Sequence, residues 1–296
     1  MRSMVILGIA ACLLALAPVG SGARAQEAAQ GAAAAPAEDA LARIARTGRI
    51  RLGYRADAPP FSYVDDRGAP AGLAVALCAR VAQTLSGPEG AAPEPVWLPV
   101  TAQSRFAALT EGRIDLLCGP ATQTLSRRRT LDFSIPYFID GAAVAFRRGG
   151  AERLAQLSDE PVGVLAGTTT EAVAARRLRE AGARSALRRF ATHEEGLRAL
   201  ARGEIEAYFA DRAILHYQLG RLRPATPLVI SDEALSFEPY ALTMKRGETR
   251  LRLAVDAALS RIYRTGAIYD LIAETMGRVR LGPLAEALYE VVALPE

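Results

Sequence analysis

The feature that most constrains the fold is an order of strands and helices that occurs twice along the chain. Short apolar runs predict strands, and apolar residues at helical spacing predict helices. The first half has predicted strands at 50–54, 96–100 and 114–118 with helices at 72–85 and 105–110. The second half has predicted strands at 162–165, 186–190 and 207–210 with helices at 168–181 and 194–201. This order predicts two α/β lobes, each a mainly parallel sheet with helices on its faces.

Two further runs indicate how the halves are joined. The segments 142–147 and 240–244 are extended and apolar, and amphipathic helices are predicted after the second of them. The chain would therefore enter a second lobe and return, so we expect lobe 1 at 41–141 and 243–296 and lobe 2 at 142–242. Two crossings form a hinge, and ligands of open α/β sheets bind beyond the carboxyl ends of the strands. We therefore expect a cleft between the lobes.

The first residues have the pattern of a secretory signal peptide. Arg2 precedes an apolar run at 5–17, and the small-x-small motif Ala-Arg-Ala stands at 23–25. This predicts a leader over 1–25 that is removed near Ala25.

A lipid anchor at Cys12 is an alternative, because the residues before it fit a lipobox. Residues 26–40 are small and polar and bury too little to order themselves, so we expect a disordered N-terminal segment there. The expected mature protein is periplasmic.

Composition excludes several classes of protein. The net charge is only +4, Lys245 is the only lysine, and no basic run is interleaved with aromatics, so nucleic acid is not an expected partner. The motifs G-x-S-x-G, Walker A and H-E-x-x-H are absent, and His193 and His216 alone form no metal cluster. We expect a monomer that binds without chemistry and needs no cofactor.

Two cysteines, Cys78 and Cys118, follow the leader. Each lies on an apolar face of a predicted element. In an oxidising compartment the two could form a disulfide, but we favour two buried free thiols.

Polar turns follow the predicted strands and hold the candidate ligand contacts. The first lobe offers Arg55, Arg105, Thr122 and Arg127. Arginine presents a planar fork that matches a carboxylate. The second lobe offers a helix N-terminus at Thr168 and Thr169, where backbone N–H groups can hold an anion, and then His193 and Asp211. Asp211 could neutralise an ammonium, so the set suits a ligand with two carboxylates and one ammonium.

Simpler interpretations exist for the same residues. Arg127 opens a run of three arginines, and such a run is usually solvated. Arg105 could pair with Glu111, and the threonines could act only as N-caps. A single histidine such as His193 is often a capping or surface residue.

Several motifs in one order carry a resemblance to a known family. They are LGYRADAPPFSYVDDRGAPAGL, RFAALTEGRIDLLCGPATQTLSRRRTLDFSIPYF, VGVLAGTTTEAV, FEPYALTMKRG and LSRIYRTGAIYDLI. The chain resembles the family 3 extracellular solute-binding proteins, the polar amino-acid receptors of ABC importers, and within them the glutamate/aspartate receptors. The resemblance covers nearly all of 41–277. It implies the two-lobed type II periplasmic-binding-protein fold.

The resemblance also implies roles for single residues. Thr122, Thr168 and Thr169 fall on ligand-contact positions, along with the five residues named next. Arg127 would hold the α-carboxylate and Asp211 the α-ammonium, while Arg55, Arg105 and His193 would hold the side-chain carboxylate.

The chain departs from the family pattern at a few positions. Ala102 replaces a serine, and Pro120 with Ala121 replaces a Ser-Thr pair, which removes hydrogen-bond donors. Ala58 stands where many relatives place an aromatic residue.

The resemblance implies a receptor that captures an acidic amino acid and delivers it to the membrane permease and ATPase subunits of an ABC importer. One alternative is a prephenate or arogenate dehydratase on the same fold, for which Glu171 and Glu238 are the candidate acids. A detached sensor domain for the same ligands is another.

Overall fold

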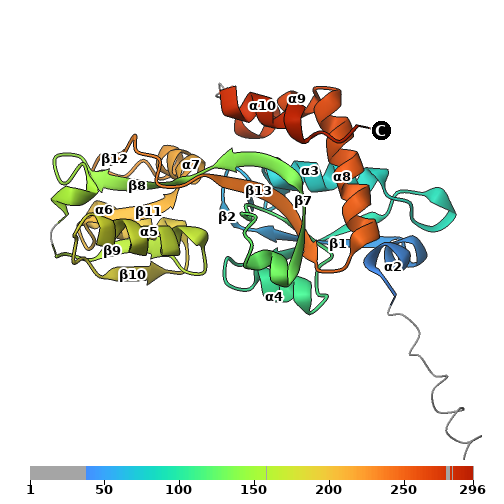
Figure 1. The fold of residues 1–296 in the computed structure, drawn as a ribbon, viewed down its shortest axis with the longest axis horizontal. Coiled ribbons are helices and arrows are strands. Elements are labelled where there is room, and N and C mark those ends of the chain that lie inside the picture. Colours follow the sequence, from blue (N-terminus) through green and yellow to red (C-terminus); the bar gives the residue numbers. More distant parts are fainter. Residues whose placement is uncertain (1–37, 158, 278–280, 282, 296) are drawn as a thin grey trace, which may run out of the picture. The chain divides into compact units, whose positions relative to one another are not determined.

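The computed structural model describes residues 38–157, 159–277, 281 and 283–295. From Asp39 onward the chain forms one compact unit, built on two five-stranded sheets (Figure 1). We call each sheet with the helices packed on it a lobe. The prediction of an α/β fold with two sheets is therefore confirmed. The predicted leader, the candidate anchor Cys12 and most of the segment 26–40 lie outside the described residues.

The sheet of lobe 1 combines parallel and antiparallel strands. In spatial order its strands are β5 (Glu94–Val100), β1 (Arg49–Arg55), β6 (Leu116–Cys118), β13 (Glu238–Lys245) and β7 (Leu131–Asp140). Strand β1 runs parallel to both β5 and β6, whereas β13 is antiparallel to β6 and β7. The carboxyl ends of β5, β1 and β6 therefore lie at one edge, and Arg55 is the last residue of β1.

The sheet of lobe 2 has a similar plan. Its strands are β10 (Leu187–Phe190), β9 (Val162–Leu165), β11 (Ala207–Asp211), β8 (Ala142–Arg147) and β12 (Leu228–Ile230). The first three are parallel, and β8 and β12 are antiparallel to their neighbours. A small antiparallel sheet, which the sequence did not predict, follows β1 and consists of β2 (Asp57–Ala58), β3 (Ser62–Val64) and β4 (Pro70–Ala71).

Helices cover both faces of each sheet. Lobe 1 carries α2 (Ala40–Thr47), α3 (Leu73–Thr84), α4 (Arg105–Thr110), α8 (Thr249–Arg264), α9 (Ala267–Met276) and α10 (Pro283–Val292). Lobe 2 carries α5 (Thr169–Glu180), α6 (His193–Arg202) and α7 (Arg212–Leu222). Single 3-10 turns are η1 (Pro88–Gly90), η2 (Arg127–Arg129) and η3 (Leu154–Gln156). The sequence placed the end of a disordered segment at residue 40, but helix α2 begins there. The Asp39 side chain caps this helix by accepting a hydrogen bond from the Ala42 N–H.

Alternation along the strands explains why both faces are covered. In β8, Val144 packs in the core beneath α5, while the neighbouring Ala145 packs in a second core with Leu200 of α6 and Leu215 of α7. Successive side chains of a strand point to opposite faces, so a strand with consecutive apolar residues needs cover on both sides.

The chain crosses between the sheets twice. It passes from β7 to β8 at Gly141 and returns from β12 to β13 through 231–237. The crossings touch, since Leu235 N–H donates to the Ala142 carbonyl at 2.9 Å. A Cβ at Gly141 would lie 2.1 Å from the Ser236 carbonyl oxygen, so only glycine fits there.

The preference for two free thiols was wrong. Cys78 of α3 and Cys118 at the end of β6 form a disulfide, with Cα atoms 5.9 Å apart. Both residues are fully buried where α3 packs on the sheet, which brings them within the range that a disulfide requires. Apolar spacing identified both buried faces but did not give their register.

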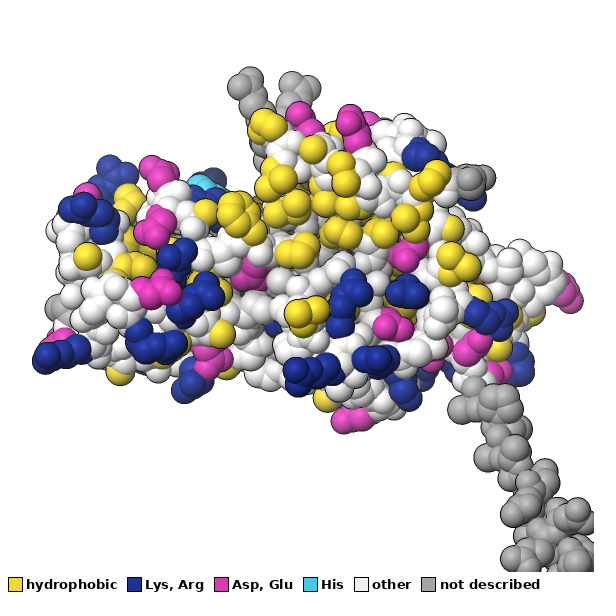
Figure 2. All heavy atoms as spheres, in the orientation of Figure 1, with side chains coloured by type: hydrophobic (Ala, Val, Ile, Leu, Met, Phe, Trp, Pro, Cys, Tyr) yellow, Lys and Arg dark blue, Asp and Glu magenta, His cyan; other side chains and the backbone are white. Residues whose placement is uncertain are grey.

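An apolar groove lies beside the crossings. It is lined by residues of β7, α7 and the C-terminal region, among them Phe138, His216 and Met276. Exposed apolar side chains such as Phe237 and Leu284 lie nearby, and Figure 2 shows apolar side chains gathered across this face. Among the described residues, no helix combines the length and apolarity needed to cross a membrane.

Candidate ligand-binding site

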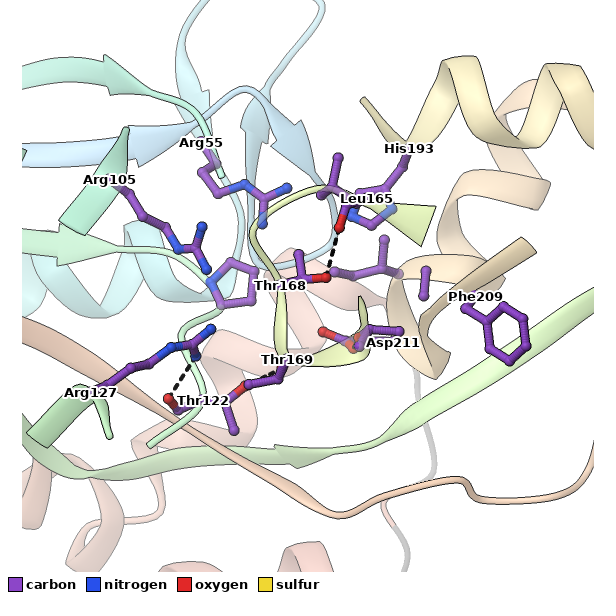
Figure 3. Close-up of a pocket in the computed structure, with 14 residues that line it drawn as sticks. Arg55, Arg105, Thr122, Arg127, Leu165, Thr168, Thr169, His193, Phe209 and Asp211 are labelled. Carbon is purple, nitrogen blue, oxygen red and sulfur yellow. Dashed lines mark hydrogen bonds between the residues drawn. The ribbon is translucent and has the colours of Figure 1, made fainter. Parts of the chain in front are cut away.

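All of the predicted contact residues lie around one pocket between the lobes (Figure 3). The cavity between these residues is small, about 20 Å³, so the walls of the pocket lie close together. The predicted lining residues are Arg55, Arg105, Thr122, Arg127, Thr168, Thr169, His193 and Asp211. The other lining residues were not predicted as ligand contacts; they are Pro120, where the family pattern has a hydrogen-bond donor, and Leu165, Thr170, Phe209, Ala210 and Ile214.

The fold brings these residues together because each stands at the end of an element. Arg55 and Asp211 are the last residues of β1 and β11, and Arg105, Thr169 and His193 are the first residues of α4, α5 and α6. The carboxyl ends of the parallel strands in both lobes therefore face the same space, as expected for open α/β sheets.

Arg105 is the most unusual residue of the pocket. It is only 2% exposed, its Nη2 donates to the Gly167 carbonyl across the pocket at 3.2 Å, and its Nε and Nη1 have no partner. Burial, together with the charges of Arg55 and Arg127, holds the pKa of Arg105 well below its ordinary value. Buried polar groups are nearly always paired, so these two nitrogens indicate that an acceptor outside the protein belongs here.

Arg127 lies lower in the pocket, beside Thr122 and Thr169 (Figure 3). Its Nη1 donates to the Thr122 carbonyl at 2.9 Å, and its guanidinium lies 4.8 Å from the Phe106 ring centroid. The next two arginines of the run, Arg128 and Arg129, are exposed. The run therefore divides into one pocket residue and two surface residues.

Arg55 is already paired within the protein. Its Nε and Nη2 donate to the two carboxylate oxygens of Asp57 at 2.9 and 3.0 Å. Burial raises the pKa of Asp57, but the Arg55 charge and hydrogen bond outweigh it and the net shift is downward. Asp57 is not among the contact residues that the sequence predicted.

The opposite wall of the pocket carries the carboxylate of Asp211. It accepts hydrogen bonds from Thr170 Oγ1 at 2.7 Å and from the Tyr240 hydroxyl. Burial, with the nearby charge of Glu238, raises the pKa of Asp211 to about 6. Above that pH a carboxylate faces the pocket, which suits a cationic group of a ligand.

His193 contributes a neutral ring. Its Nδ1 lies 3.2 Å from the Tyr208 hydroxyl, and its buried Nε2 has no partner. Burial, with the nearby charge of Arg55, lowers the pKa of His193 to about 3. The imidazole therefore offers a hydrogen bond rather than a charge.

Threonine hydroxyls and Glu238 join the two lobes at the base of the pocket. Thr122 of lobe 1 and Thr169 of lobe 2 both donate to Glu238 Oε2, and Thr168 donates to the Leu165 carbonyl at 2.8 Å. Glu238 is 2% exposed. The sequence suggested Glu238 only as a possible acid for a dehydratase, and the other such candidate, Glu171, pairs with Arg189 at 2.6 Å.

A carboxylate pair also surrounds Tyr240 at the hinge. The Tyr240 hydroxyl donates to Asp211 and lies 3.5 Å from Asp140 Oδ2. Burial, with the charge of Asp211, raises the pKa of Asp140 to about 8. Among the described residues, no group of His, Cys, Asp and Glu side chains is arranged to hold a metal ion.

The raised pKa of Asp140 predicts how stability depends on pH. An aspartate that ionises near pH 8 when folded and near pH 4 when unfolded favours the folded state at low pH, and this contribution is lost as the pH rises through 8. Between pH 7 and pH 9 the ligand-free protein should lose on the order of 1 kcal/mol of unfolding free energy. Urea denaturation measures it. Asp140→Asn should abolish the decline, and an unchanged decline in that variant would contradict the assignment.

The lobes and the polar pocket between them define a two-lobed ligand-binding protein of the type II periplasmic-binding fold. The chain belongs to the bacterial extracellular solute-binding proteins, family 3, whose sequence profile matches residues 50–277.

Curated relatives and a solved structure agree with this. The chain is 26% identical to the glutamate/aspartate import solute-binding protein of Escherichia coli K12, over 79% of this chain and 78% of that protein. It is also 26% identical to the glutamine-binding protein of an ABC transporter of Bacillus subtilis, over 79% and 83% of the two chains. The solute receptor for L-cysteine of Neisseria gonorrhoeae has a similar structure, with a TM-score of 0.73 at 26% identity over 83% of this chain and 98% of that one. The relatives are solute-binding proteins rather than enzymes, and so is this chain.

Proposed function

We propose that the protein is an extracytoplasmic receptor for an acidic α-amino acid, glutamate or aspartate. The observation that carries the proposal is Arg105, whose guanidinium is buried with two unpaired nitrogens. The same pocket contains the carboxylate of Asp211. Arg127 would hold the α-carboxylate and Asp211 the α-ammonium. Arg105 and His193 would hold the side-chain carboxylate.

Contacts between the lobes support a mechanism of closure over the ligand. Gln103 Nε2 of lobe 1 donates to the Ala166 carbonyl of lobe 2 at 3.1 Å, and Arg105 makes the neighbouring contact to Gly167. These contacts lie beside Arg105, Leu165 and Thr168, which line the pocket. A ligand that draws the two lobes together there would stabilise the closed form. A receptor of this kind presents the closed form to the permease and ATPase subunits of an ABC importer.

The names of the relatives support an amino-acid ligand, and one of the two names supports an acidic one. The Escherichia coli protein is named for glutamate and aspartate, and the Bacillus subtilis protein for glutamine. The proposal also includes a periplasmic location and a leader over 1–25, with lobe 2 ending before Glu238, because β13 belongs to the sheet of lobe 1.

Isothermal titration calorimetry of the purified protein tests the proposal. Glutamate, aspartate, glutamine, cysteine and arginine are titrated in turn, and an acidic amino acid is expected to bind at least tenfold more tightly than its amide. Equal affinity for glutamate and glutamine would refute the acidic ligand, and binding of none would refute the function. An assay with prephenate tests the dehydratase alternative, and turnover would replace the proposal.

A further inference from the structure

We propose that Asp57 is a specificity-determining residue that limits the ligand side chain to one negative charge. The inference rests on the proposed function, because it concerns the same pocket. By holding Arg55, Asp57 takes the place that a second anionic group of the ligand would otherwise occupy.

Asp57 binds Arg55 as the carboxylate of a bound ligand would. Arg55 presents its Nε and Nη2 to the two oxygens of Asp57, which is the bidentate arrangement that guanidinium groups use for bound carboxylates. The Arg55 side chain is 3% exposed and that of Asp57 is 21% exposed. An ion pair with so little solvent around it is only weakly screened.

The position of Asp57 is fixed from both lobes. Its backbone pairs with Tyr63 in the small sheet that follows β1. From lobe 2, Gln218 Nε2 donates to the Asp57 carbonyl at 3.2 Å, and Gln218 is itself buried. Closure of the lobes therefore holds Asp57 against Arg55 rather than releasing it.

The local charges then set what the pocket can accept. Arg55, Arg105 and His193 lie together in the upper part of the view in Figure 3. His193 is neutral there, and Asp57 cancels the charge of Arg55. One positive charge, that of Arg105, remains for the side chain of the ligand. A side chain with one negative charge is matched by it, whereas a second negative charge would find Arg55 already paired with Asp57.

The experiment compares L-glutamate with O-phospho-L-serine at pH 8, where the phosphate carries nearly two charges because its second pKa is about 6. The wild type should prefer glutamate. In Asp57→Asn the preference should shift by at least about tenfold toward phosphoserine, since Arg55 is freed for the second charge. Asp57→Ser should shift it in the same direction, and thermal denaturation shows that each variant is folded.

The chain offers a matched control. Glu111 also pairs with an arginine two residues away, Arg113, at 2.7 Å, but on the surface. Glu111→Gln removes the same charge from the protein and should leave the preference unchanged. If the wild type binds glutamate and neither Asp57 variant shifts the preference, or if Glu111→Gln shifts it equally, the inference is wrong while the proposed function stands. If the wild type binds neither ligand nor any other amino acid, both are wrong.

Discussion

Arg105→Met is expected to weaken binding of the acidic amino acid by at least about 100-fold and, at the same time, to raise the melting temperature of the ligand-free protein. Removing one partner of a buried charge pair costs about 2–5 kcal/mol of binding free energy. Without ligand, however, the guanidinium is buried with two unpaired nitrogens and is repelled by Arg55 and Arg127. Replacing such a charge by an apolar side chain of similar length removes a desolvation penalty.

Calorimetric titration and thermal denaturation of the ligand-free variant measure the two effects. Arg113→Met is a suitable control, because Arg113 follows the same helix but is 54% exposed and should change neither quantity. Opposite signs of the two effects would identify Arg105 as a residue kept for binding. If Arg105→Met instead lowers stability and affinity together, the residue is a structural one.

The regular elements could be predicted from the sequence because their apolar residues follow a clear period. Helix α4 and strands β8 and β9 lie where the pattern put them. Strand β7 was not recognised, because it contains Pro136, which removes a backbone donor. Its place at the sheet edge and a register shift opposite Pro136 accommodate the proline. Helix α7 was missed because Asp211 is both the last residue of β11 and the residue at the N-cap position of α7, so no turn residues separate the two.

The positions of the pocket residues could likewise be predicted, since each follows a predicted strand. Their partners could not. Glu238 accepts hydrogen bonds from Thr122 and Thr169, which are distant from it in the sequence. The Cys78–Cys118 disulfide depends on how helix α3 is positioned on the sheet. Pairs of this kind are set by packing in three dimensions, which periodicity does not report. The Arg55 and Asp57 pair had a usable signal, because two opposite charges stand only two residues apart.

Asp211→Asn is expected to reduce the affinity for glutamate by at least about 100-fold while leaving the affinity for glutarate nearly unchanged. Glutarate carries the two carboxylates but no ammonium, so it does not use the charge of Asp211. Asparagine has almost the same shape and can still accept the hydrogen bond from Thr170. The affinity for glutamate falls because the variant loses the buried charge pair between Asp211 and the ammonium. Asp232→Asn, a change at an exposed residue of the second crossing, should affect neither ligand.

The pH dependence of glutamate binding tests the same contact independently. Because the pKa of Asp211 is raised to about 6 in the ligand-free protein, the residue is mostly protonated at pH 5 and mostly ionised at pH 7. Only the ionised form attracts an ammonium, so glutamate affinity should rise about tenfold across this interval, as the linkage of binding to a single ionisation requires. His193 stays neutral over the same range and adds no opposing charge. In Asp211→Asn the rise should vanish. A rise that persists in the variant, or an equal loss of glutarate and glutamate, would mean that Asp211 shapes the pocket without touching the ammonium.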